Sequence, residues 1–131
     1  MVLVEVVQEL ADELPPLDAD RDQLTQVVLN LLENARDAVA SRGSEQSVGR
    51  ITVRTGLTRS ALSLEVEDNG PGFDLALKER LFAPYFTTKD NGTGLGLAIV
   101  RRIVTDHGGK IDAFSEPGVG ARFVVELPSA S

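Results

Sequence analysis

The feature that most constrains this chain is a pair of glycine-rich segments between Val66 and Val100. The first reads Asp-Asn-Gly-Pro-Gly (68–72) and follows directly on a stretch of alternating apolar residues. The second reads Gly-Thr-Gly-Leu-Gly-Leu (92–97), and the aromatic run Phe-Ala-Pro-Tyr-Phe (82–86) lies between the two. Glycine lets a backbone turn tightly and approach a ligand closely. We therefore interpret the rest of the chain as a scaffold that holds these two turns in place.

Bulk properties limit the classes of protein to consider. The chain has 131 residues, which fits a single domain spanning 1–131 with a short tail at 129–131. It has no cysteine, so disulfides and thiolate metal sites are excluded. The net charge of −7 argues against a nucleic-acid-binding protein. No apolar run is long enough for a membrane span, so we expect no direct membrane contact and a cytoplasmic location.

Periodicity predicts a mixed α/β domain. We expect an edge strand within 1–10, a long helix from Asp20 to about Gly43, and a strand hairpin over 50–57 and 61–68. A short helix at 74–80, a helix at 94–107 and strands at 110–115 and 121–127 follow, with the tail from Pro128. This order predicts a two-layer α/β sandwich, with a mixed, mostly antiparallel sheet and about three helices on one face.

The long helix carries a polar side as well as an apolar stripe. Asp20 is a good N-cap, and Gln23 stands at the capping-box position. Opposite the stripe, Asn30, Asn34 and Asp37 follow one another by about one turn. A solvated surface is the simplest interpretation, but asparagine forms helices less well than the Lys or Glu that such a surface favours. The pattern therefore favours a functional face.

Two familiar nucleotide motifs do not fit the glycine-rich turns. A Walker A loop ends in Gly-Lys-Ser/Thr, and this sequence has no such ending. The dinucleotide fingerprint needs a third glycine three residues after the second, where this chain has Leu97 or Ile99. A Gly-x-Gly-x-Gly pattern alone indicates no more than a loop and a helix start.

The combination of motifs is more specific. Asn-Leu-Leu-Glu-Asn-Ala (30–35), with the two glycine-rich turns and the aromatic run, resembles the N, G1, F and G2 boxes of sensor histidine kinases. The resemblance is to their catalytic ATP-binding domain, of the Bergerat fold shared with gyrase, the Hsp90 chaperone and the mismatch-repair ATPases. It covers about 16–128, with the N box at about 26–38, G1 at 68–72, the F box at 82–86, a lid at 87–93 and G2 at 92–97. The short lid looks most like the nitrogen-regulation type.

The resemblance implies roles for individual residues. Asp68 would accept a hydrogen bond from the adenine amino group, because an ionised carboxylate is acceptor-only. Asn34 would hold Mg²⁺ through its amide oxygen, Asn30 would support the phosphates or the metal, and Glu33 would polarise an incoming histidine. The implied ATP-binding residues are Asn34, Asp37, Asp68, Gly70, Gly72, Phe86, Thr88, Lys89, Gly92, Thr93, Gly94, Leu95, Gly96 and Leu97. Phe82, Tyr85 and Phe86 would anchor the lid or pack as core aromatics.

Two positions depart from related families. Many histidine kinases have a basic residue three positions after the metal-binding asparagine, where this chain has Asp37. ATP-hydrolysing relatives carry a glutamate base at the place of Asn30, whose amide is not basic. Hydrolysis should therefore be slow.

The resemblance also implies partners. The phospho-acceptor histidine of the family lies on a separate helical dimerisation domain, and a response regulator receiver domain then takes the phosphoryl group. No helical hairpin fits before Asp20, so we expect that acceptor domain to lie outside these residues and this domain to be a monomer. His107, the only histidine, is expected to end the third helix as a cation near the helix dipole rather than to accept phosphate.

Two alternatives stay open at this point. One is another enzyme of the same fold, such as an anti-sigma serine kinase or a small ATPase, although Asn30 argues against the ATPase. The other is a nucleotide-sensing module that binds a partner without catalysis.

Overall fold

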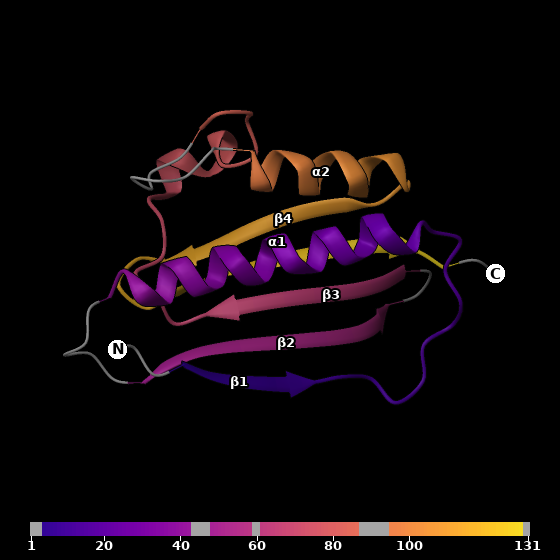
Figure 1. Ribbon diagram of the computed structural model, residues 1–131, viewed down its shortest axis with the longest axis horizontal. Helices are drawn as coiled ribbons and strands as arrows, with labels where there is room; N and C mark the ends of the chain where they lie inside the picture. Colours follow the sequence, from indigo (N-terminus) through magenta and orange to yellow (C-terminus); the bar gives the residue numbers. More distant parts are fainter. Residues whose placement is uncertain (1–3, 43–47, 59–60, 87–94, 130–131) are drawn as a thin grey trace.

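The computed structural model describes residues 4–42, 48–58, 61–86 and 95–129. Its five strands are β1 (Val4–Glu9), β2 (Gly49–Thr58), β3 (Ala61–Asp68), β4 (Lys110–Glu116) and β5 (Gly120–Pro128). They form one sheet in the order β1-β2-β3-β5-β4, in which β1 runs parallel to β2 and the other neighbours are antiparallel (Figure 1). The predicted mixed, mostly antiparallel sheet is confirmed, and the strand predicted within 1–10 lies at its edge.

Two α-helices cover one face of this sheet. Helix α1 (Arg21–Ala40) lies over β2 and β3, and α2 (Gly96–Asp106) lies over β4 and β5, antiparallel to α1 (Figure 1). The 3₁₀-helix η1 (Leu75–Arg80) begins after Asp74, as predicted, and reaches β4 through an ion pair from Lys78 to Asp112 at 3.1 Å. No helix in the described segments is long and apolar enough to cross a membrane.

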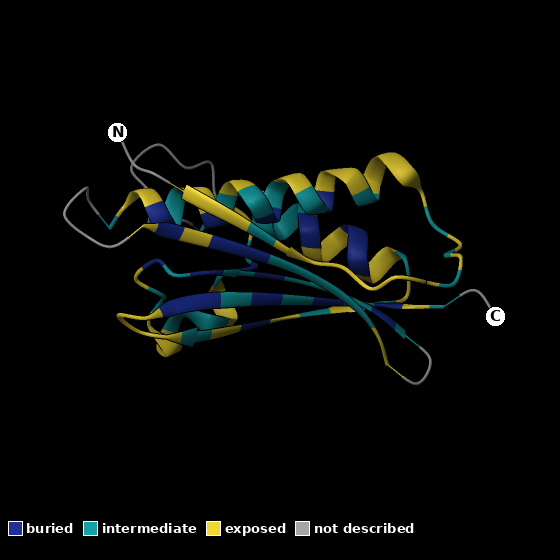
Figure 2. Cartoon of the chain, turned by 90° about the horizontal axis from the view of Figure 1, so that it is seen from below, coloured by how far each residue is buried: buried dark blue, intermediate teal, exposed yellow. Residues whose placement is uncertain are grey.

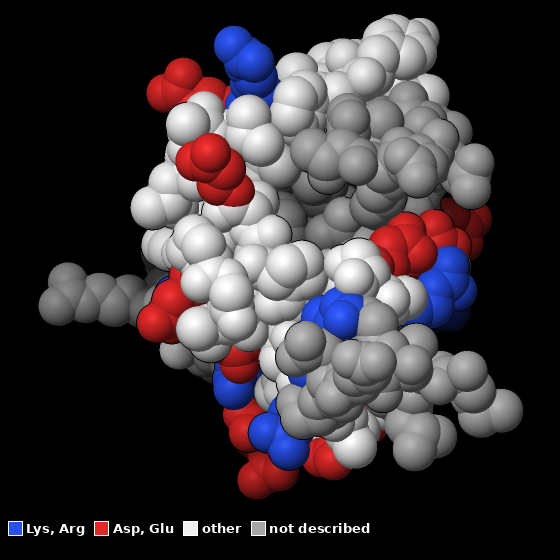
Figure 3. All heavy atoms as spheres, turned by 90° about the vertical axis from the view of Figure 1, so that its left-hand side faces the viewer, with Lys and Arg blue, Asp and Glu red and all other residues white. Residues whose placement is uncertain are grey.

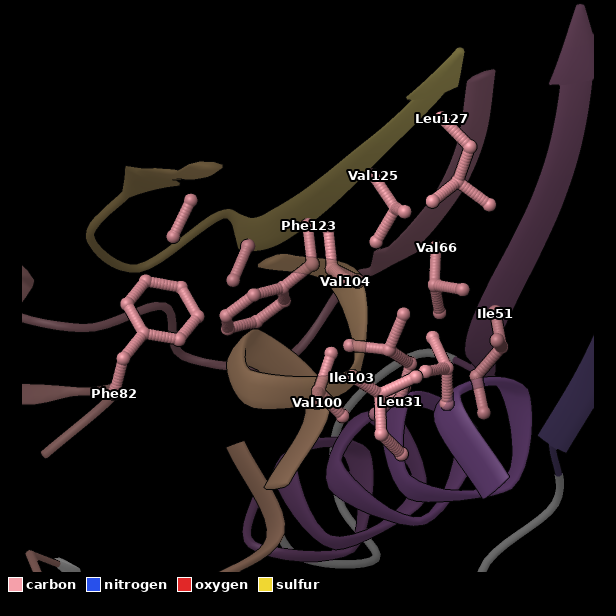
Figure 4. Close-up of a cluster of buried hydrophobic side chains, with 14 of the residues drawn as sticks. Leu31, Ile51, Val66, Phe82, Val100, Ile103, Val104, Phe123, Val125 and Leu127 are labelled. Atoms are coloured by element: carbon pink, nitrogen blue, oxygen red, sulfur yellow. The ribbon is translucent and has the colours of Figure 1, made fainter. Parts of the chain in front are cut away.

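The core lies between the helices and the sheet. Figure 2 shows that the helices turn buried residues towards the strands and exposed residues away from them. From Val27 to Val39 every fourth residue of α1 is buried, which is the spacing that places side chains on one helix face. The close-up in Figure 4 shows Leu31 of α1 and Val100 of α2 among strand residues such as Val66. Phe82 packs edge-on against Phe123, with ring centroids 6.2 Å apart.

Several boundaries differ from the prediction. Asp20 caps α1 by accepting a hydrogen bond from the Gln23 backbone, but its own N–H donates to His107 and not to the Gln23 side chain. Within the described residues the third helix begins at Gly96, after Leu95. Pro128 is the last residue of β5 rather than the start of a tail, because it pairs with Ala61 of β3.

The face without α-helices carries a ladder of ion pairs. Arg54 of β2 contacts Glu9 of β1 at 2.6 Å and also contacts Glu65 of β3, and Arg122 of β5 contacts Glu65 at 2.9 Å. Burial raises the pKa of Glu65, but the hydrogen bonds from the two arginines outweigh it and hold that pKa below its ordinary value. This face is therefore built as a cross-strand charge network, distinct from the helix-covered face.

Candidate functional site

Asp68 is a buried carboxylate at the end of β3. Side chains alternate along a strand, so Asp68 lies on the same sheet face as Val66, the face covered by α1. Asp68 is only 4% exposed, and its Oδ1 accepts a hydrogen bond from the Gly70 backbone N–H at 2.9 Å. Burial raises the pKa of Asp68 to about 6, although hydrogen bonds from the backbones of Gly70 and Ala121 oppose the shift. A strongly perturbed buried acid of this kind marks a candidate binding site.

The shifted pKa of Asp68 predicts a pH-dependent cost to stability. The folded protein binds this proton more tightly than the unfolded chain, so the unfolding free energy falls as the pH rises from 3.8, the ordinary value, to beyond about 6. At pH 7 the ionised group should cost about 3 kcal/mol. Denaturant unfolding of wild type and Asp68→Asn should therefore show a stability difference that grows in favour of the variant between about pH 4 and pH 7. A difference that is independent of pH would contradict the shift.

The glycines after Asp68 are needed for close packing. A Cβ atom built on Gly70 would lie 2.8 Å from the carbonyl oxygen of Ala38, in the last turn of α1. Gly72 has a φ of 74°, and a Cβ there would lie 2.7 Å from Ser115 Oγ. The first glycine-rich turn is therefore pressed between the end of α1 and the β4–β5 end of the sheet.

Gly72 and Gly118 offer a matched test of this packing. Both have positive φ, 74° and 82°, but nothing lies within 4 Å of a Cβ built on Gly118. Alanine at either position should cost about 1–2 kcal/mol for the left-handed backbone. Gly72→Ala should lose about 1–3 kcal/mol more, because its methyl group would overpack the turn. Equal losses in unfolding free energy for the two variants would show that the close approach at Gly72 does not matter.

Two polar side chains that sequence reasoning missed hold this turn. Asn69 Oδ1 accepts from the Arg50 backbone at 2.6 Å, and its Nδ2 donates to the Val48 carbonyl at 3.1 Å. Ser115 Oγ accepts from the Phe73 backbone N–H and donates to the Phe73 carbonyl, both at 2.8 Å. Asn69 stands inside the motif, but its partners are distant in sequence: Arg50 of β2, Val48 just before β2, and Arg42 just after α1. Nothing in the sequence pairs Ser115 with Phe73.

The polar side of α1 reaches α2 through Asn30. Asn30 Nδ2 donates to the Gly96 carbonyl at 3.3 Å, at the first residue of α2. Asn30 and Asn34 are half-buried, whereas the Asp37 side chain is 43% exposed and lies 3.8 Å from Arg36, so this side of α1 is partly solvated. Glu33 is exposed on α1. The structure therefore brings Asn30 together with the start of α2, where Gly96 is exposed and Leu95 and Leu97 are half-buried.

The aromatic run divides between the core and the surface. Phe82 is buried against Phe123, as the core interpretation requires, and Phe86 is half-buried. Tyr85 is 77% exposed and has a φ of 67°, so it is not a core aromatic. A hydrogen bond from the Phe86 N–H to the Ala83 carbonyl closes a tight turn around Pro84 and Tyr85, which carries the Tyr85 side chain outward.

Some predicted site residues lie outside the described part of the chain. These are Thr88, Lys89, Gly92, Thr93 and Gly94, with the rest of the lid at 87–93. Within the described residues, no three His, Cys, Asp or Glu side chains are grouped so that they could hold a metal ion. This fits Mg²⁺, which keeps waters and phosphate oxygens as ligands and needs few from the protein. The half-buried Asn34 offers one amide oxygen.

A hollow of about 570 Å³ lies at the same end of the sheet. Asp68 borders it, but most of its lining comes from other residues, such as Arg50, Thr52, Phe114 and Arg122. By strand alternation these four side chains belong to the face without α-helices. The sheet separates these four side chains from α1 and α2, so we place the functional site on the helix-covered side of Asp68 and not in the hollow on the opposite face. Figure 3 looks at this end of the molecule and shows acidic and basic side chains interspersed rather than gathered in one patch.

His107 ends α2, as predicted, but not as a cation. Its Nε2 accepts from the Asp20 N–H at 3.1 Å, and its Nδ1 lies 2.7 Å from the Ile103 carbonyl. A carbonyl only accepts and an amide N–H only donates, so the ring in this arrangement is neutral with its hydrogen on Nδ1. The predicted interaction of a charged histidine with the helix dipole is therefore wrong.

Comparisons with known proteins place these observations in a family. The family model described as histidine kinase-, DNA gyrase B-, and HSP90-like ATPase matches residues 19–131. The chain is 45% identical over 126 residues to the signal transduction histidine-protein kinase AtoS of Escherichia coli (strain K12), covering 95% of this chain and 20% of AtoS. It is 38% identical over 130 residues to the sensory histidine kinase/phosphatase NtrB of Klebsiella oxytoca, covering 95% of this chain and 37% of NtrB. The chain thus spans well under half of these relatives.

Solved structures agree with the sequence comparisons. The nucleotide-free catalytic domain of the histidine kinase ThkA matches with a TM-score of 0.82 and 36% identity, over 96% of this chain and 79% of that one. Full-length ShkA in complex with AMPPNP matches with a TM-score of 0.83 and 29% identity, over 98% of this chain and 26% of that one. The chain therefore belongs to the histidine kinase-, DNA gyrase B- and HSP90-like ATPase family, and it is the ATP-binding catalytic domain of a histidine kinase.

Proposed function

We propose that this domain binds Mg²⁺-ATP between Asp68, α1 and the start of α2, and donates the γ-phosphoryl group to a histidine on a separate helical dimerisation domain. In that transfer a bond forms between phosphorus and the histidine nitrogen as the bond to the β-phosphate oxygen breaks, and ADP leaves. A response regulator receiver domain would then receive the phosphoryl group on an aspartate. We place the reaction in the cytoplasm, where ATP is available, and expect this domain alone to be a monomer.

The buried Asp68 carboxylate is the observation that carries the proposal. Keeping an ionised carboxylate at 4% exposure costs desolvation free energy. A ligand that donates a hydrogen bond to the carboxylate would offset this cost. Oδ1 already accepts from Gly70, and a carboxylate has further acceptor sites for the adenine amino group. Gly70 and Gly72 complete this part of the site by fixing the turn beside the carboxylate.

The phosphate end of the site is built from α1 and the N-terminus of α2. The first N–H groups of a helix and its dipole attract anions, and Gly96 is exposed at that end. We assign phosphate contacts to this turn, from Gly92 to Leu97, and to Thr88, Lys89 and Thr93 of the lid. When bound, Mg²⁺ would neutralise phosphate charge, and Asn34 would hold it. Asp37 stands where many relatives have a basic residue. A carboxylate would repel phosphate, so Asp37 would contribute to nucleotide binding through water or the metal rather than through a direct phosphate contact.

Asn30 favours phosphoryl transfer over hydrolysis. An amide at this place cannot take a proton from water, and its Nδ2 already donates to the Gly96 carbonyl. Glu33, which is exposed one turn away, is our candidate to polarise the histidine that arrives from the partner domain. A serine kinase of the same fold remains the second candidate function, because it would use the same nucleotide site.

A transfer assay tests the proposal. The domain is mixed with a helical dimerisation domain from a related histidine kinase and with ATP labelled on the γ-phosphate. We expect the label to appear on that partner as an acid-labile, base-stable phosphohistidine, and to be absent when the acceptor histidine is replaced by alanine. Acid-stable label would indicate a serine kinase, release of inorganic phosphate without label on protein would indicate an ATPase, and binding without transfer to any acceptor would favour the sensing module.

A further inference from the structure

Helices α1 and α2 are joined by polar contacts at both ends of α2. At its start, the Gly96 carbonyl accepts from Asn30 Nδ2 of α1 at 3.3 Å. Just after its end, His107 Nε2 accepts from the backbone N–H of Asp20, the N-cap residue of α1, at 3.1 Å. The helices run antiparallel, so these contacts lie at opposite ends of α2 (Figure 1).

Between these two points the helices pack through apolar side chains. Val100, Ile103 and Val104 of α2 are buried in the core that also holds Leu31 of α1. Apolar packing stabilises the helix pair but is not directional. Hydrogen bonds depend on distance and angle, so these two polar contacts add directional constraints on how far α2 extends along α1 and how it is rotated.

The bond between His107 and Asp20 also fixes the histidine ring. Nδ1 donates to the Ile103 carbonyl at 2.7 Å, one turn back in α2, which holds the ring against its own helix. The same ring presents an unprotonated Nε2 to Asp20. His107 therefore connects the last turn of α2 to the first residue of α1 only as the neutral tautomer with hydrogen on Nδ1.

His107 is far from the nucleotide site. Helix α2 has 11 residues, and a helix of that length spans about 16 Å. The side chain at one end cannot touch a ligand bound at the other, but a shift at its own end is carried along the rigid helix. The position of Gly96 relative to Asn34 therefore depends on the bond that His107 makes.

We propose that His107 is a positioning residue, which holds the N-terminus of α2 in place for the nucleotide triphosphate through its hydrogen bond to Asp20. The inference rests on the proposed nucleotide site. His107 affects binding of the phosphates and not binding of the adenine, because the adenine end of the site is built on β3 and the turn that follows it.

The affinities for ATP and for adenosine distinguish an effect on the phosphate end of the site from an effect on the adenine end. In His107→Ala the affinity for ATP should fall about tenfold, the cost of one lost hydrogen bond between the helices. The affinity for adenosine, which lacks phosphates, should stay within about twofold of wild type. Titrations followed by nuclear magnetic resonance measure both ligands. Arg102→Ala is the matched control on the same helix, because its side chain is 85% exposed and, among the residues that the structure describes, pairs along the helix with Asp106 at 4.0 Å.

His107→Gln tests the acceptor itself. A glutamine oxygen can take the place of Nε2, so this variant should regain most of the ATP affinity that His107→Ala loses. Equal losses for ATP and adenosine in His107→Ala would indicate general destabilisation and overturn the proposal, as would ATP affinity equal to wild type.

The wild-type protein gives an independent test that needs no variant. Its single histidine should show the nitrogen shifts of the neutral tautomer with hydrogen on Nδ1. A histidine with hydrogen on Nε2 would overturn the proposed bond even if His107→Ala does not fold. If the wild type binds neither adenosine nor ATP, the proposed nucleotide site itself fails, and the role of His107 fails with it.

Discussion

Replacing Asp68 with asparagine should weaken ATP binding at least about a hundredfold while the domain stays folded. Asp68 Oδ1 accepts from the Gly70 N–H, and the adenine amino group would bring a second donor to the same side chain. A carboxylate can accept from both. An amide has one oxygen and one NH₂ group, so in Asp68→Asn one of the two donors would face another donor. Calorimetric titration with ATP measures the loss.

The base of the nucleotide provides the control for this variant. Inosine triphosphate carries an oxygen where ATP carries the amino group, so it presents an acceptor at that place. The preference for ATP over inosine triphosphate should therefore be large in wild type and should shrink or reverse in Asp68→Asn. An Asp68→Asn variant that binds ATP within threefold of wild type would show that the amino group does not meet this carboxylate.

Replacing Asn34 with alanine should remove the benefit that Mg²⁺ gives to ATP binding and should reduce phosphoryl transfer at least about a hundredfold. Asn34 is half-buried and stands one turn after Asn30, which contacts the start of α2. Its amide oxygen is the type of ligand that Mg²⁺ accepts. Binding without Mg²⁺ should change little, because alanine keeps the helix and the adenine end intact. Titrations with and without Mg²⁺ and the transfer assay measure the two effects.

Two further variants of α1 make the Asn34 result specific. Asn34→Asp keeps an oxygen at the same place and should retain a dependence on Mg²⁺. Thr25→Ala changes an exposed residue whose hydroxyl, within the described part of the chain, donates back to the Arg21 carbonyl of its own helix, so it should leave transfer unchanged. If Asn34→Ala still binds ATP more tightly with Mg²⁺ than without it, the metal is held elsewhere.

The sequence predicted the architecture well because its signals are local. Asp20 caps α1, the apolar residues of that helix recur at helical spacing, and the alternating stretches before Asp68 pair as a hairpin. Each of these signals lies within a short window of the chain. The motif combination then identified the family, which the comparisons confirm.

The contacts that fix the site were not predictable in the same way. His107 meets Asp20 across 87 positions of sequence, and Ser115 meets Phe73 across 42. Such partners depend on how helices and strands are placed in space, which no local pattern specifies. His107 is an example: a cation suits the end of an isolated helix, but the neighbouring N–H of Asp20 requires an acceptor there.

The same reasoning explains Tyr85. Aromatic residues near buried ones are usually buried themselves, but the tight turn that follows Ala83 carries this side chain outward. The roles of Thr88, Lys89 and Thr93 stay predictions, since those residues lie outside the described part of the chain.

The most direct test of where the nucleotide binds is a map of backbone amide shifts on titration with Mg²⁺-ATP. The proposed site predicts the largest changes at Gly70, Asn34 and Gly96, on the helix-covered face of the sheet. Changes concentrated instead at Arg50, Phe114 and Arg122, around the hollow on the opposite face, would contradict it.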